Sequence, residues 1–143
     1  IWIAPGNPSE ISRQGDRIVM QHEFMDTTRM IYLDPATAPI DVQPSVAGFS
    51  LGRFEGDELV VETTNFSAGV LLSHTSAGSD GVVHSDALEL IERYRVDENG
   101  DLIFSWEATD SKYFTGPIRG GVSLSATTLA PGTYDCEVET EGQ

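Results

Sequence analysis

The side chain best placed to do chemistry is the carboxylate of Glu92, because the pattern around it is that of an apolar strand face. Alternate residues of a β-strand point to the same side, and the residues that share this side with Glu92 are Leu88, Leu90, Tyr94 and Val96. If the face is interior, the carboxylate either pairs with a cation or becomes easier to protonate. We expect Arg29 as the partner, since it shares a face with Ile31 and Leu33. A structural ion pair and a role as general acid or base both remain open.

Two histidines are the other candidates for moving a proton. His22 alternates with Ile18 and Met20, which predicts an inward side chain that is either a core residue or a proton carrier. His84 stands where an irregular segment enters a long strand, and there it either caps a turn or transfers protons near neutral pH. The catalytic residues that the sequence predicts are Glu92, His84, Arg29 and His22.

Large apolar side chains on the same rows predict a pocket for a small molecule. The residues expected to contact the substrate are Tyr94, Trp106, Phe24, Met20 and Phe104. The chain has no Cys and His spacing typical of a zinc site, no glycine-rich phosphate loop and no GxSxG elbow. We therefore expect neither a metal nor a cofactor.

Composition excludes several classes of partner. The 143 residues carry 23 acids and 8 Lys or Arg, a formal net charge of −15, which disfavours nucleic acid and anionic membrane surfaces. No run of about 18 apolar residues is present, so membrane insertion is not expected. Because the chain begins at Ile1 rather than at methionine, we expect a processed or truncated N-terminus preceding a single domain, residues 1–143.

Short alternating segments separated by turn residues predict an all-β, mostly antiparallel fold. The clearest hairpin turns at Asn99-Gly100. Residues 67–83 have no periodicity, which leaves a mobile lid or a short strand tucked into the core as alternatives. The predicted strands are Arg17–Met25, Thr28–Leu33, Phe49–Phe54, Glu58–Phe66, Asp86–Val96, Leu102–Thr109 and Val122–Leu129.

Three stretches carry a resemblance to a known family. Residues 52–63 read GRFEGDELVVET, residues 84–94 read HSDALELIERY, and residues 110–115 read DSKYFT. They resemble a family of secreted bacterial proteins with GRWEGDTLVVDT-like, HSEALHVTERF-like and DPKAYT-like motifs, and Arg-x-Ile-x-Leu-Asp at 29–34 also fits. Phe54 stands where the family motif has Trp.

The resemblance spans about residues 17–117 and implies an exported, periplasmic or secreted protein. It also implies a lipocalin-like barrel, and the fold that we predict is therefore an antiparallel lipocalin-like β-barrel open at one end. The family has no settled activity, so it implies no reaction for this chain.

The function expected from the residues is cofactor-free acid–base catalysis in the barrel interior. The substrate would be a small, largely apolar molecule, and the reaction an isomerisation, cyclisation, hydration or dehydration. Glu92 or His84 would move the proton, and Arg29 would either pair with the carboxylate or polarise the substrate. The alternatives are a non-catalytic protein that binds a small hydrophobic ligand and a purely structural or partner-binding domain. In the first two cases the partner is a small hydrophobic molecule, and homo-oligomerisation is left open.

Overall fold

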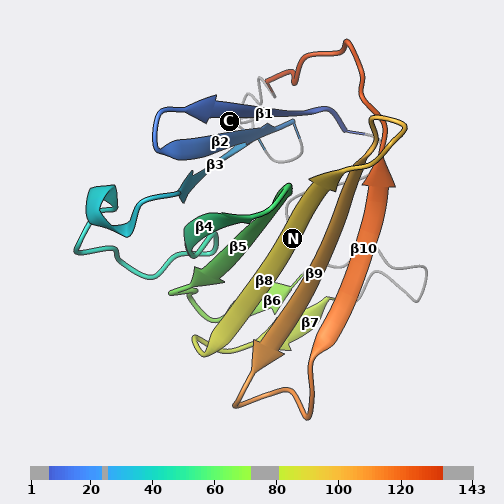
Figure 1. The fold of residues 1–143 in the computed structure, drawn as a ribbon. Coiled ribbons are helices and arrows are strands. Elements are labelled where there is room, and N and C mark those ends of the chain that lie inside the picture. The colour runs from blue at the N-terminus through green and yellow to red at the C-terminus, as the bar shows by residue number, and fades with distance from the viewer. Residues whose placement is uncertain (1–6, 24–25, 72–80, 134–143) are drawn as a thin grey trace, which may run out of the picture.

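The main element is one curled sheet, seen in a computed structural model that describes residues 7–23, 26–71 and 81–133. Its eight strands stand in the order β1-β2-β3-β4-β5-β8-β9-β10 and form a half-barrel (Figure 1), as expected for a lipocalin-like open barrel. The strands are β1 (Ser9–Gln14), β2 (Arg17–His22), β3 (Thr27–Tyr32), β4 (Phe49–Glu55), β5 (Glu58–Thr64), β8 (Leu88–Val96), β9 (Leu102–Asp110) and β10 (Ile118–Leu124).

Neighbouring strands pair antiparallel at every joint but one. β3 and β4 run parallel, because the proline-rich excursion between them brings the chain back to start β4 in the same direction. Their register consists of two pairs, Ile31 with Ser50 and Tyr32 with Leu51, so this is the shortest joint of the sheet. Within the described residues, β1 and β10 form the two edges of the sheet.

The predicted strand boundaries hold well in the central hairpins and less well at the ends. β10 begins at Ile118 instead of Val122, because Gly120 and Gly121 continue the strand rather than break it. Gly120 is needed there, since the indole of Trp106 lies where a Cβ atom would stand. β2 ends at His22, and Phe24 lies outside the described residues, so its expected substrate contact stays a prediction.

For residues 67–83 the sequence leaves a lid or a strand tucked into the core as alternatives, and a short strand lies at each described end of this segment. β6 (Gly69–Leu71) pairs antiparallel with β7 (Val82–His84) in a separate two-stranded sheet. Leu71 is buried against the main core. The described part therefore matches the alternative of a short strand packed on the core.

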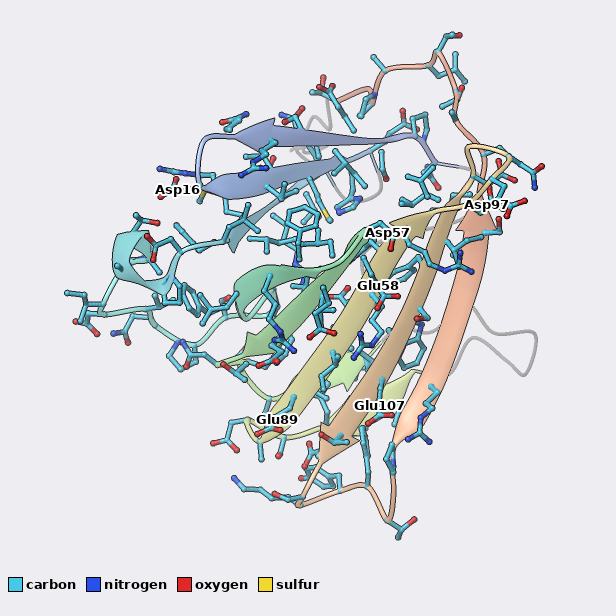
Figure 2. The ribbon with its side chains drawn as sticks, viewed as in Figure 1. Asp16, Asp57, Glu58, Glu89, Asp97 and Glu107 are labelled. Carbon is cyan, nitrogen blue, oxygen red and sulfur yellow. The ribbon has the colours of Figure 1, made fainter. Side chains whose placement is uncertain are left out.

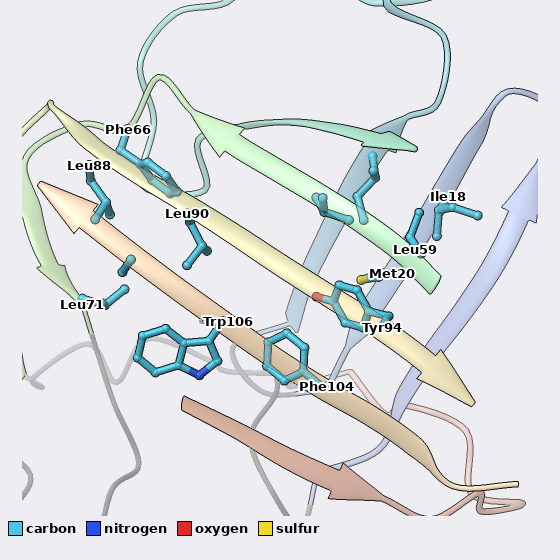
Figure 3. Close-up of a cluster of buried hydrophobic side chains, with 13 residues drawn as sticks. Ile18, Met20, Leu59, Phe66, Leu71, Leu88, Leu90, Tyr94, Phe104 and Trp106 are labelled. Carbon is cyan, nitrogen blue, oxygen red and sulfur yellow. The ribbon is translucent and has the colours of Figure 1, made fainter. Parts of the chain in front are cut away.

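The core lies on the concave side of the half-barrel (Figure 3). Alternation along β8 sends Leu88, Leu90 and Tyr94 inward, and β9 does the same with its even-numbered residues. Tyr94 and Phe104 stack with ring centroids 4.8 Å apart. The labelled side chains of Figure 3 on β8 and β9 belong to this buried cluster.

Most of the charged side chains lie on the convex side and in the turns. Asp57 and Glu89 are exposed (Figure 2), and the cross-strand pair of Arg119 with Glu107 lies on the same outer side of the sheet. The segregation of apolar and charged residues explains how an acidic chain keeps an apolar interior. No helix within the described ranges has the length and apolar character that crossing a bilayer requires.

A Gly120→Ala substitution tests the close packing at the β10 edge. The added methyl group would stand 2.6 Å from Cζ2 of Trp106, so the buried indole must move. We expect a loss of about 1–3 kcal/mol in the free energy of unfolding, with a changed near-ultraviolet circular dichroism signal. Gly116→Ala is the control, because nothing lies within 4 Å of its Cβ position. Equal stability of the two variants would contradict the packing.

Candidate functional site

The expected ion pair forms in the middle of the core. Nη1 of Arg29 donates to Oε1 of Glu92 at 2.9 Å, and Nη2 donates to Oε2. The two side chains are 3 % and 1 % exposed, so neither charge is solvated by bulk water. The prediction that Glu92 points inward and pairs with Arg29 is confirmed.

Hydroxyl groups from three strands complete this cluster, which we call the polar core: Arg29, Ser50, Thr63, Glu92 and Tyr94. Arg29 donates through Nη2 to Oγ1 of Thr63 at 2.7 Å and through Nε to Oγ of Ser50 at 3.1 Å. The hydroxyl of Tyr94 donates to Oε1 of Glu92 at 3.0 Å. All five residues are buried, and hydrogen bonds of this kind offset the cost of burying two charges.

The electrostatics of the polar core hold its protons in place near neutral pH. Burial alone would lower the pKa of Arg29, but the negative charge of Glu92 raises it above its ordinary value. Burial and the same carboxylate raise the pKa of Tyr94 well above its ordinary value. Arg29 therefore remains a cation and Tyr94 remains protonated, which suits a structural cluster better than a proton relay.

Among the described residues, His22 has the one buried side-chain nitrogen or oxygen atom without a hydrogen-bond partner. Its Nδ1 forms a hydrogen bond with Oγ of Ser9 at 2.9 Å, and the two residues are register partners on β1 and β2. Its Nε2 is buried and has no hydrogen-bond partner in the described part of the chain. Burial and the nearby positive charge of Arg29 lower the pKa of His22 to about 4, so the imidazole is neutral near pH 7.

His84 lies elsewhere on the core. It ends β7, its Nδ1 donates to the carbonyl oxygen of Ser85 at 2.9 Å, and its ring meets Phe66 edge to face. The next residue, Ser85, donates two hydrogen bonds to the carboxylate of Asp110, one from its backbone N–H and one from its hydroxyl. Among the described contacts, none joins His84 to the polar core or to His22.

A groove of about 500 Å³ lies at the seam where the first residues of β1 approach the last residues of β10. Its walls include Ser9 and Ile11 of β1 and Val122 and Leu124 of β10. Ile11 is the register partner of Met20, and Val122 that of Phe104; both partners are buried inward, so the groove opens on the concave side. We call this site the seam groove.

Residues 125–133 cover part of the seam groove. After β10 the chain runs back toward the β1 edge (Figure 1) and contributes Leu129 to the lining. The backbone N–H of Gly132 donates to Oε2 of Glu23 at 2.9 Å, which ties this segment to the end of β2.

The structure brings together some of the predicted residues and separates others. Glu92, Arg29 and Tyr94 meet in the polar core, and Trp106 is the register neighbour of Glu92. Met20 and Phe104 are the buried register partners of the groove residues Ile11 and Val122, and neither of them lines the groove. The lining of the groove contains none of the four predicted catalytic residues, although Ser9 connects it to His22.

Sequence reasoning missed Ser9 and Ser50. Ser50 accepts from Arg29 only because the parallel joint places β4 beside β3, and no local pattern announces that joint. Ser9 reaches His22 through the β1–β2 register. Thr63, by contrast, alternates with Leu59 and Val61, so its inward direction could be found from strand periodicity.

Comparisons with protein-family models, with curated proteins and with solved structures gave no match. In the described ranges no group of three or more His, Cys, Asp or Glu side chains is arranged to hold a metal ion. The functional argument therefore rests on the site geometry.

Breaking the buried pair tests whether the polar core is structural. Glu92→Leu leaves the guanidinium of Arg29 buried without its counter-charge, and we expect a loss of about 3–5 kcal/mol in the free energy of unfolding in urea. The double variant Arg29→Met, Glu92→Leu should recover a large part of that loss. Glu107→Leu, in the solvent-accessible pair with Arg119, should cost no more than about 1 kcal/mol. An unchanged midpoint for Glu92→Leu would refute the pairing.

The buried neutral His22 predicts a pH-dependent stability. Its pKa is about 4 when folded and 6.5 in the reference state, so the unfolded chain binds the extra proton between these values. The free energy of unfolding is therefore unaffected by protonation of His22 above pH 6.5. It decreases by up to about 3 kcal/mol as the pH falls toward 4. Urea unfolding of wild type and His22→Gln between pH 7 and pH 4 measures the difference. A difference that stays constant over this range would show that His22 does not titrate as described.

Proposed function

We propose that the protein binds a small, largely apolar molecule in the seam groove. The observation that carries this proposal is an apolar groove of about 500 Å³ on the concave side, between two sheet edges that do not pair within the described residues. Sites for small molecules typically have volumes of about 300–1,000 Å³ and apolar walls with few polar groups. Half-open antiparallel barrels offer such a space where the sheet fails to close.

The lining supports an apolar ligand more strongly than the outer surface does. The apolar residues that line the seam groove are Pro8, Ile11, Leu102, Val122, Leu124 and Leu129. A second groove of about 500 Å³ lies on the convex side, but Arg93, Glu107 and Arg119 line it. These charged side chains already pair with acids or bases of the same face, so an apolar molecule gains less there.

An acid–base enzyme is the second candidate, and the free Nε2 of His22 is the observation that favours it. A neutral imidazole with one unpartnered nitrogen can take up a proton there and give it back. Glu92 is less suited to this role, since both of its oxygens accept from Arg29 and Tyr94. If turnover occurs at the seam, Ser9 and His22 are the groups that connect to it.

Binding of a neutral apolar fluorophore, N-phenyl-naphthylamine, tests the proposal. We expect saturable binding to wild type, and Ile11→Asp should weaken it at least about tenfold, because the ligand would bury a carboxylate. Leu129→Asp, on the covering segment, is an independent second variant with the same expected effect. Val46→Asp places the same charge on an exposed residue outside the groove and should leave affinity unchanged.

The melting midpoints of all three variants are measured alongside, so that unfolding is not mistaken for lost binding. No binding to wild type, or equal affinity in the groove variants and the control, would refute the seam groove as the site. Conversion of a ligand by wild type that His22→Gln loses, with affinity retained, would select the enzyme over the binding protein.

A further inference from the structure

We infer that the ligand of the seam groove is uncharged and carries a carbonyl oxygen that accepts a hydrogen bond from the hydroxyl of Ser9. This inference rests on the proposed function and adds the chemical class of the ligand to it. Three features of the described residues carry it: the charge of the lining, the contact of Ser9 with His22, and the unpartnered Nε2 of His22.

The lining of the groove favours a neutral molecule. Its eleven residues include no charged side chain. Moving a charged ligand group out of water without a counter-charge is costly, whereas a neutral ligand oxygen needs only one hydrogen bond. The net charge of −15 further disfavours an anion.

The pair of Ser9 and His22 determines which kind of oxygen is accepted. A neutral imidazole carries its proton on one nitrogen, and here Nδ1 contacts Ser9 while Nε2 is buried without a partner. Buried N–H groups without an acceptor are rarer than acceptors without a donor, so the proton belongs on Nδ1. Nδ1 then donates to Oγ of Ser9, and Nε2 keeps a free lone pair.

This arrangement turns the hydroxyl of Ser9 into a donor directed at the ligand. Because Oγ already accepts from His22, its own hydrogen is free for a partner in the groove that Ser9 lines. A carbonyl oxygen is a suitable acceptor, and the remaining apolar walls accommodate the rest of the molecule. His22 acts here as a positioning residue that orients the serine.

Matched ligands separate this inference from the proposed function. Acetylnaphthalene, ethylnaphthalene and naphthoate have the same ring system but differ in carrying a ketone, no oxygen or a carboxylate. In displacement of N-phenyl-naphthylamine from wild type, we expect the ketone to bind about fivefold more tightly than the hydrocarbon, the worth of one net hydrogen bond. Naphthoate should bind more weakly than both.

Ser9→Ala should abolish the preference for the ketone and leave the affinity for ethylnaphthalene unchanged. Ser125→Ala removes another hydroxyl from the lining and serves as the matched control, with the preference retained. Nitrogen NMR of the His22 ring shows which ring nitrogen carries the proton, and a serine with a merely structural role would not fix this. We expect the proton on Nδ1.

The outcomes are distinct. If the fluorophore does not bind wild type, the proposed function fails. If it binds but ketone and hydrocarbon have equal affinities, or if Ser9→Ala keeps the preference, only the inference fails. A proton found on Nε2 would reverse the donor and acceptor at Ser9 and would also overturn it.

Discussion

The buried pair of Arg29 and Glu92 is the interaction on which the half-barrel depends. The sheet is weakest at the β3–β4 joint, where the parallel register holds only two residue pairs. The side chain of Arg29 leaves β3 and reaches Ser50 on β4, Thr63 on β5 and Glu92 on β8. One guanidinium thus connects four strands across the shortest joint. A planar cation with several donors suits this task, because it can satisfy partners in different directions at once.

The same interaction decides what the interior can do chemically. The carboxylate of Glu92 receives three hydrogen bonds and is 1 % exposed, so both of its oxygens are already engaged within the polar core. The seam groove lies apart from this cluster, where β1 and β10 do not pair within the described residues. Ile11 and Val122 line the groove, and the hydrogen bond of Ser9 links this lining to the buried His22.

Prediction from the sequence succeeded where strand alternation was clear. The inward direction of Glu92, Tyr94 and Phe104 followed from their rows, and the hairpin at Asn99-Gly100 followed from its turn residues. The β10 boundary was wrong because glycine normally weakens a strand, whereas Gly120 is required beneath the indole of Trp106. At Gly120 the contact with Trp106 therefore outweighs the low strand propensity of glycine.

The sequence by itself determined the all-β class, the faces of the central strands and the pairing of Glu92 with Arg29, because a period of two assigns each side chain to a side. Only the tertiary structure decided that His84 stands apart, that Ser50 joins the polar core, and that Ser9 lines an open seam. These relations depend on which strands are neighbours and where the sheet stops, and such long-range pairings leave no local signal in the chain.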